Sequence, residues 1–364
     1  MAPINKYLPQ SVSHPGATLE EKLNEMGISI KEFALRSGKP EKTIIAIIKE
    51  LSSITQEMAI KFENITKIPA GFWMRNQMRY DEYKTRERLQ ILITEAEEWT
   101  RKFPYPQMAD LYGLPKTRKV KEKTINLFQF FAVSSHTAWE NLYMKSKLKV
   151  AAYTTLAHTH EPHAISAWLR QGELQAKQID APDYDAKKFK INLAQIKSIM
   201  AEQPDDYFSQ LQQLCLDAGV KLVYTPKMPK APISGSTRWI HSSPLIQLTA
   251  RYRQNDRFWF TFFHEAGHIL LHGKKYISLE NIDFLKADPE KEQEANNFAE
   301  EWTFPKKLEQ EVLKAIPLKA DDIVLFAKKF NTHPALIFGR FHHKKLIPYS
   351  IGCEFIEPIN LSVD

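Results

Sequence analysis

Two histidines and a glutamate stand in the order His264-Glu265-Ala266-Gly267-His268, the spacing His-Glu-x-x-His. Residues four apart on an α-helix differ by about 40° in azimuth and one turn along the axis, so both imidazoles can face one metal ion. Glu265 lies about 100° round from His264, close enough to hold a water molecule beside that ion. The spacing therefore predicts metal-assisted hydrolysis, with Glu265 as general base.

The surroundings of this motif indicate a buried helix. Aromatic residues precede the motif and aliphatic residues follow it, in the run FWFTFFHEAGHILLHG. Because the chain has only 12 histidines, about 0.05 or fewer chance occurrences of the motif are expected. The alternative is a core helix whose two histidines are merely hydrogen-bonded. We favour a metal site because adjacent imidazoles in an apolar core need a reason to be there.

A hydrolytic zinc site normally has a third protein ligand and a water molecule. One known arrangement places a third histidine six residues after His268, but that position is Lys274. His272 is one helical turn beyond His268 and lies too far along the axis to share the ion with His264. We therefore interpret His272 as structural or as a support for the ligands.

The segment that follows supplies acidic candidates for the third ligand. Asp288 as N-cap and Pro289 at the first helical position predict the start of a helix. Glu294 borders the inner stripe of this helix, so we predict it as the ligand in preference to Glu292 or Glu290. The predicted inner stripe consists of Ala295, Phe298, Ala299 and Trp302.

The stretches FWFTFFHEAGHILLHG and EQEANNFAEEWTFP resemble the ImmA/IrrE metallopeptidases. That group contains phage anti-repressors and radiation-response proteases that cleave a partner repressor. The similarity extends from about Ala218 to Ile347. It includes GVKLVY and PLIQLT, which we expect to be strands beside the active-site helix, and FAKKFNTHPALIFGRFHH, which resembles the C-terminal helical segment of the group.

This resemblance implies Zn2+ as cofactor, with His264, His268 and Glu294 as ligands and Glu265 as base. Such a set of two histidines and one glutamate is of the thermolysin type. One departure is Trp302-Thr303-Phe304-Pro305, where relatives usually carry aliphatic residues before the proline. That difference alters packing more than chemistry.

Two further features of the site are left open by the sequence. The segment Leu245–Thr249 is expected to be a strand that could pair with an extended substrate. The oxyanion of the transition state also needs a hydrogen-bond donor. The candidate donors are His272, His333, His342, Tyr276 and Arg238.

Residues 14–75 have the pattern of five short helices. Gly27 is a predicted C-cap, and Ser29 and Thr55 are predicted N-caps. Two of the helices are joined by the short turn Gly38-Lys39-Pro40, which is typical of a helix-turn-helix. The five predicted helices are Ala17–Met26, Ile30–Ser37, Glu41–Lys49, Gln56–Asn64 and a last one that begins at Pro69-Ala70-Gly71.

The stretches SHPGATLEEKLNEMGISIKEFALRSGKPEKTIIAII and ITQEMAIKFENITKIPAGFWMRNQ resemble the Cro/repressor-like (XRE) domains of HigA-type antitoxins. The resemblance implies that Glu41–Lys49 is the recognition helix. Base edges or phosphates would then lie near Glu41, Lys42 and Thr43, and the DNA backbone near Lys31 and Lys39.

Departures from this resemblance leave an alternative open. Relatives usually carry Gln where this chain has Ile30, and an Asn-Gly-type turn where it has Lys49-Glu50-Leu51. The recognition helix is also unusually apolar, with four isoleucines among its residues. The bundle could instead form a homodimer, as repressor-like domains often do, or bind another protein.

Composition and length set the remaining expectations. The excess of 50 Lys and Arg over 43 Asp and Glu gives a net charge of +7, which permits contact with nucleic acid. The two cysteines, Cys215 and Cys353, are far apart, which argues for a reducing compartment and against a cysteine-ligated metal. Without a signal-peptide pattern or an apolar run of about 20 residues, we expect a cytoplasmic protein with no membrane partner.

The fold is predicted to be α+β and mainly helical. We expect an all-α helix-turn-helix bundle at 1–80, a helical middle region at 81–215, and a zincin-like domain at 216–364 with a three-to-four-stranded sheet packed on the motif helix. The predicted function is a regulatory zinc metallo-endopeptidase that cleaves a specific protein, such as a repressor or an antitoxin-like regulator. The alternative is a non-enzymatic transcriptional regulator that binds operator DNA and a partner toxin.

Overall fold

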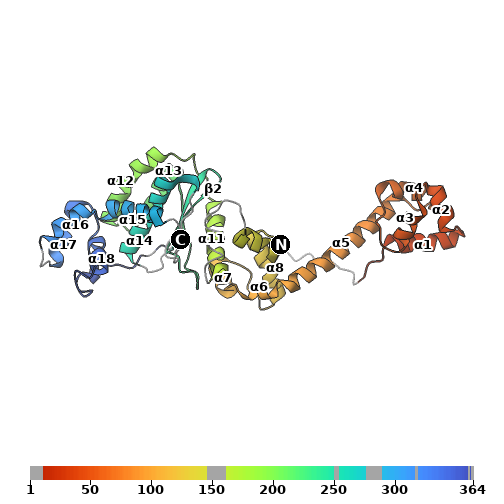
Figure 1. Cartoon of the computed structure of the whole chain (residues 1–364), viewed down its shortest axis with the longest axis horizontal. Coiled ribbons are helices and arrows are strands. Elements are labelled where there is room, and N and C mark those ends of the chain that lie inside the picture. Colours follow the sequence, from red (N-terminus) through yellow and green to blue (C-terminus); the bar gives the residue numbers. More distant parts are fainter. Residues whose placement is uncertain are drawn as a thin grey trace. The chain divides into compact units, whose positions relative to one another are not determined.

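The computed structural model describes residues 11–145, 161–249, 254–275, 289–315, 319–359 and 361. The chain divides into two compact units, Met1–Glu95 and Ala96–Asp364. Among the residues described, the first unit is all helical, and the second combines helices with one small sheet (Figure 1). The predicted α+β, mainly helical fold is therefore confirmed. No helix within the described ranges is both long and apolar enough to span a bilayer.

The first unit begins with four short helices whose ends follow the sequence signals. Ser29 Oγ accepts a hydrogen bond from the Glu32 amide at 3.2 Å, and Thr55 Oγ1 accepts one from Met58 at 3.3 Å. Gly27 takes φ +63°, the left-handed conformation that ends a helix. The helices are α1 (Pro15–Met26), α2 (Ile30–Ser37), α3 (Glu41–Ile48) and α4 (Gln56–Thr66).

The fifth helix, α5 (Ala70–Glu95), closes the bundle with Trp73. Trp73 is fully buried and packs edge-on against Phe62. The helix runs on without interruption because no Gly or Pro occurs between 72 and 95. The predicted domain boundary at 80/81 is therefore wrong, because it falls inside this helix and the first unit ends at Glu95.

The second unit contains the predicted middle region from Ala96 onward, together with the C-terminal part. Trp168 on α11 donates its Nε1–H to the Thr225 carbonyl at 3.3 Å, and Gln247 donates to the Trp168 carbonyl at 2.7 Å. These bonds attach the middle region to the sheet, so the structure has no boundary at 215/216. The helices are α6 (Glu97–Arg101), α7 (Tyr105–Tyr112), α8 (Val120–Phe131), α9 (His136–Glu140), the π-helical turn η1 (Asn141–Lys145), α11 (Pro162–Ala176), α12 (Ala186–Glu202) and α13 (Tyr207–Asp217).

The sheet has three strands, β1 (Lys221–Tyr224), β2 (Gly235–Ile240) and β3 (Ser243–Leu248), in the order β1-β3-β2. β3 pairs parallel to β1 and antiparallel to β2. The expected strands at GVKLVY and PLIQLT are thus present as β1 and β3. Because β3 is paired on both sides, the expectation that Leu245–Thr249 pairs with a substrate is wrong. β2 instead forms one edge of the sheet.

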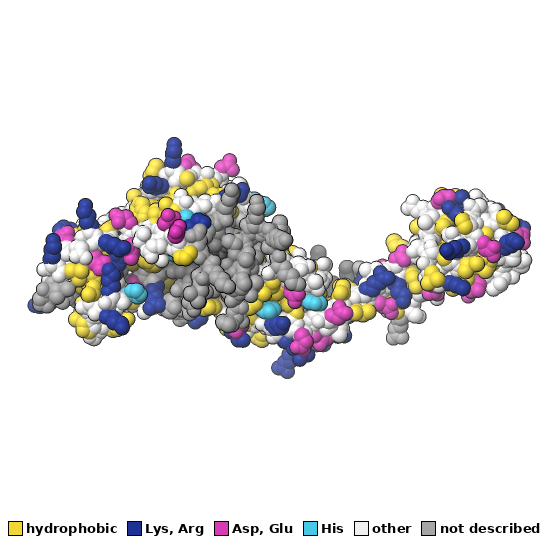
Figure 2. All heavy atoms as spheres, in the orientation of Figure 1, with side chains coloured by type: hydrophobic (Ala, Val, Ile, Leu, Met, Phe, Trp, Pro, Cys, Tyr) yellow, Lys and Arg dark blue, Asp and Glu magenta, His cyan; other side chains and the backbone are white. Residues whose placement is uncertain are grey.

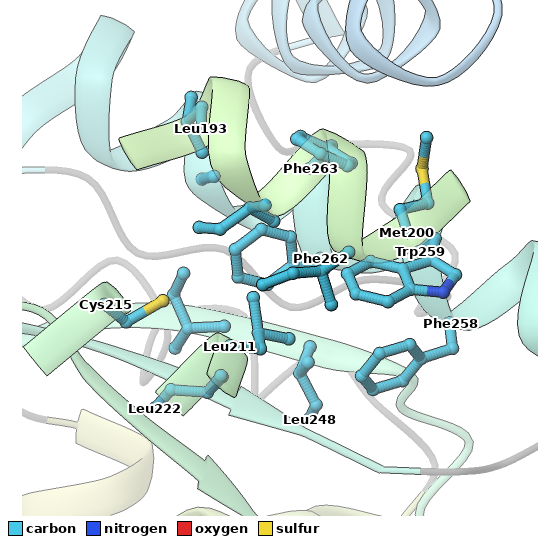
Figure 3. Packing of buried hydrophobic residues seen from close by; sticks show 14 of the residues in the cluster. Leu193, Met200, Leu211, Cys215, Leu222, Leu248, Phe258, Trp259, Phe262 and Phe263 are labelled. Atoms are coloured by element: carbon cyan, nitrogen blue, oxygen red, sulfur yellow. The ribbon is translucent and has the colours of Figure 1, made fainter. Parts of the chain in front are cut away.

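The motif helix α14 (Asn255–Gly267) packs on this sheet through an aromatic core. Phe258, Trp259, Phe262 and Phe263 pack together with residues of α12, α13 and the strands (Figure 3). The predicted N-cap of the following long helix, Asp288, lies outside the described residues. After α14 the chain forms the π-helical turn η2 (His268–His272), the short η3 (Gly273–Lys275), α15 (Pro289–Thr303), α16 (Lys306–Leu313), α17 (Ala320–Phe330), α18 (Pro334–His343) and η4 (Cys353–Phe355).

Candidate metal centre

The two motif histidines meet where α14 passes into η2. His264 and His268 are both buried, and their Nε2 atoms lie 3.0 Å apart. Burial lowers the pKa of His268 to about 4, against the opposing effect of Glu292. The imidazole is therefore neutral at neutral pH, which is the form that ligates a metal.

The third group is Glu292, which corrects the prediction of Glu294. The Glu292 carboxylate lies 3.3 Å from His264 Nε2 and 3.5 Å from His268 Nε2. One ligand atom from each of these three residues falls within 4.8 Å of the others. Glu294 instead lies against His272, with 2.9 Å between its Oε2 and the His272 Nε2.

The phase of α15 explains this correction. Ala295, Ala299 and Thr303 are its buried residues, and Glu292 stands one turn before Ala295 on the same face. Glu294 lies about 200° round the helix from Glu292, and its side chain is 60% exposed. Glu292 stands three residues before Ala295, and Ala295 stands four residues before Ala299. This spacing along one helix face was the sequence signal for Glu292.

Further polar groups hold the histidines in place. Asn296, one turn after Glu292, lies with its Oδ1 3.0 Å from His264 Nδ1. His272 lies with its Nδ1 2.9 Å from His268 Nδ1. Sequence reasoning missed Asn296, although its spacing from Glu292 places it on the same face of α15. Two imidazoles and one carboxylate, with a hydrogen-bond partner at the Nδ1 atom of each imidazole, fit the donor set preferred by Zn2+.

Glu265 is buried against the edge strand. Its backbone carbonyl accepts a hydrogen bond from Thr237 Oγ1 on β2 at 3.0 Å. A Cβ at Gly235 would lie 2.7 Å from the Glu265 Oε1, so only glycine allows the strand to come this close. The Glu265 carboxylate therefore packs against the start of β2, and Glu265 directly follows His264 in the chain.

The predicted DNA-contacting residues lie on and beside α3. Glu41 and Lys42 are exposed at its N-terminus, Thr43 is half-buried, and Lys31 is exposed on α2. Lys39 instead pairs with Glu57 at 3.0 Å, and its side chain is only 17% exposed. Figure 2 shows basic and acidic side chains intermingled on the visible face of this bundle, without a single large basic patch.

Comparison with known families gives one match in the C-terminal part of the chain and another in the N-terminal part. Residues 215–335 match the IrrE N-terminal-like domain of the M78 peptidases, and residues 19–73 match a helix-turn-helix domain. The chain carries an IrrE-like M78 peptidase domain. The resemblances noted in the sequence at both ends are thereby confirmed. A search among curated proteins found no match.

Two solved structures are similar to part of the chain. An addiction module antidote protein of a HigA family from Coxiella burnetii is 25% identical, with 23% of this chain and 91% of that chain covered and a TM-score of 0.22. PA4674 from Pseudomonas aeruginosa, solved in complex with its operator DNA, is 28% identical, with 21% and 84% covered and a TM-score of 0.20.

A cavity of about 480 Å³ lies beside α14, the helix that carries the motif, and is also lined by α18 and the segment that follows it. Phe260 and Thr261 line it from α14, one turn before His264. Glu300 and Thr303 line it from α15, on the face that also carries Asn296. The cavity is therefore lined by the same two helices, α14 and α15, that carry His264 and Glu292.

Two of the candidate oxyanion donors, Arg238 and His342, are engaged by backbone carbonyls elsewhere in the structure. Arg238 donates to the Leu169 carbonyl at 2.5 Å, which places it on the sheet face opposite Thr237 and α14. His342 Nε2 lies 2.9 Å from the Ile351 carbonyl. The other candidates are His333, which caps α18, His272, which contacts His268, and Tyr276, which lies outside the described residues.

Proposed function

We propose that the chain is a regulatory zinc metallo-endopeptidase whose M78 domain cleaves a specific partner protein. The observation that carries this proposal is the convergence of His264, His268 and Glu292 beside the buried carboxylate of Glu265. A metal site with a purely structural role has no use for a fourth, buried acidic group. The match to a peptidase family at 215–335 supports the same conclusion.

The residues divide the chemistry among them. A Zn2+ ion held by His264, His268 and Glu292 would polarise the scissile carbonyl and acidify water in the site. Glu265 takes the proton of the attacking water and returns it to the leaving amine. Burial beside the Gly235 backbone holds this carboxylate in one place, which reduces the reorganisation needed during the reaction.

An extended substrate segment would pair with β2. This strand forms an edge of the sheet, and through Gly235 and Thr237 it contacts Glu265. Addition of a strand to a sheet edge aligns a peptide by main-chain hydrogen bonds. A substrate side chain would then enter the cavity lined by Phe260 and Thr261. We therefore expect an unfolded or loop segment of the partner to be cleaved.

The helix-turn-helix domain suggests the class of partner. A domain of this type recognises DNA, so it would bring the peptidase to an operator. A repressor or an antitoxin-like regulator bound there is the substrate that this arrangement favours. The resemblance to the ImmA/IrrE group, some of which cleave a repressor, supports this partner class.

A second candidate function is a non-enzymatic regulator that binds operator DNA and a partner toxin. The helix-turn-helix match at 19–73 favours it independently of any catalysis. In that case zinc would be structural or absent, and the buried position of Glu265 would have no explanation.

The zinc content of the purified chain tests the main proposal. We expect about one zinc ion per chain, measured by mass spectrometry of metals on protein that was never exposed to a nickel column. His343 is exposed on α18, so His343→Ala should leave the content unchanged. Failure of the wild type to retain zinc, even after zinc is offered and the excess removed, would leave the second candidate.

Lys42 on the helix-turn-helix domain should contribute to DNA affinity. Lys42→Glu places a negative charge at the exposed start of α3, so DNA binding should weaken for every DNA sequence. The slope of log affinity against log salt concentration should become shallower by about one. Fluorescence anisotropy with a random-sequence duplex at several salt concentrations measures this. The matched control is Lys187→Glu on α12 in the other unit. Equal binding by wild type and both variants would argue against DNA contact through α3.

A further inference from the structure

His272 and Glu294 lie outside the ligand set but are connected to it through ring nitrogens. Glu294 Oε2 is 2.9 Å from His272 Nε2, and His272 Nδ1 is 2.9 Å from His268 Nδ1. The chain of contacts therefore runs from a solvent-exposed carboxylate, through one imidazole, to an imidazole of the metal centre. Neither residue has a part in the cleavage chemistry described above.

The donors and acceptors in this chain can be assigned from chemistry. A carboxylate only accepts, so His272 donates its Nε2–H to Glu294. One proton then lies between the two Nδ1 atoms. If His268 donates it, the His268 Nε2 keeps its lone pair on the side of His264 and Glu292. His272 could donate it only as an imidazolium with both ring nitrogens protonated, and a neutral His268 would then carry its proton on Nε2, where metal ligation is blocked.

The backbone between the two histidines favours this contact. His268–His272 forms a π-helical turn rather than a continuation of α14. Such turns are uncommon and occur often at functional sites. The His272 side chain is only 3% exposed, so its ring is fixed between His268 and α15. A ring held in this way can set the orientation of its neighbour.

We propose that His272 and Glu294 form a positioning relay, which orients His268 and fixes its tautomer for metal binding; this inference rests on the proposed function. Metal-ligating histidines commonly donate their second N–H to a carboxylate or carbonyl. Here the carboxylate acts through a second histidine. Glu294, first expected as a ligand, thus supports one instead.

Zinc affinity tests the relay, measured by competition with a chromophoric chelator. His272→Phe fills the same space without an acceptor and should weaken zinc binding by about 10- to 100-fold. Glu294→Ala should weaken it by a smaller factor, and Glu294→Gln should fall between Glu294→Ala and wild type because the amide oxygen still accepts from His272. The matched control is Glu290→Ala, an exposed glutamate on the same helix, which should bind as wild type does.

A second readout separates positioning from general stability. Co2+ in place of zinc should show an altered visible absorption spectrum in His272→Phe and Glu294→Ala, because the ligand geometry changes. Since Glu294 is 60% exposed, its variants should fold normally, which thermal unfolding of the metal-free protein can verify. Wild-type zinc affinity and an unchanged spectrum in the Glu294 and His272 variants would overturn the relay alone. A wild-type chain that binds no zinc would overturn the proposed function as well.

Discussion

Glu265→Gln should abolish cleavage while the chain keeps its zinc. Glutamine has nearly the same size and can still accept a hydrogen bond, but it cannot take a proton from water at neutral pH. General base catalysis contributes about 10²- to 10⁴-fold, so kcat/KM should fall by that factor. A proteome-derived peptide library, with products identified by mass spectrometry, measures the loss even while the natural partner is unidentified.

The zinc content of this variant is its internal control. Glu265 is not among the three groups that converge, so metal per chain should equal that of wild type. Glu290→Gln, on the exposed face of α15, provides a matched change of one glutamate and should cleave normally. If Glu265→Gln produced the same fragments at the wild-type rate, another group would have to be the base.

The motif residues were predictable because their chemistry depends on local spacing. His264 and His268 are one helical turn apart, and any α-helix brings them together whatever the rest of the fold does. The strands at GVKLVY and PLIQLT were also predictable from short apolar runs. Contacts between distant segments were less predictable. β2 was not located from the sequence, and the central place of Leu245–Thr249 in the sheet depends on its pairing with β2.

The third group of the candidate metal centre shows where reasoning from sequence spacing fails. Glu294 directly precedes Ala295, whereas Glu292 stands between Lys291 and Gln293, so adjacency in the sequence favoured Glu294. The three-residue spacing to Ala295 nevertheless places Glu292 on the buried face of the helix. The rotation of α15 is set by Gly267, where a Cβ would lie 3.1 Å from the Phe298 ring, and by the burial of Ala295 and Ala299. These contacts turn Glu292 toward the histidines. The predicted domain boundary at 80/81 falls inside α5, because that helix continues to Glu95 through a region with little apolar pattern.

Glu292→Ala should remove the metal from the chain. Its carboxylate is the only group from α15 placed within 3.5 Å of both His264 and His268 Nε2 atoms among the described residues. Loss of a ligand should weaken zinc binding by more than about 100-fold, the most that loss of an outer partner usually causes. Chelator competition measures the affinity, and peptide cleavage should disappear in parallel.

The comparison with Glu294→Ala makes this prediction specific. Both variants remove one glutamate from α15, so they have the same net charge and the same helix propensity. We expect Glu292→Ala to lose zinc, and Glu294→Ala to retain it with a moderately reduced affinity. Glu292 is 25% exposed at its side chain, so its removal leaves no large cavity and the fold should persist. The reverse order of affinities would restore Glu294 as the ligand and would mean that α15 rotates when zinc binds.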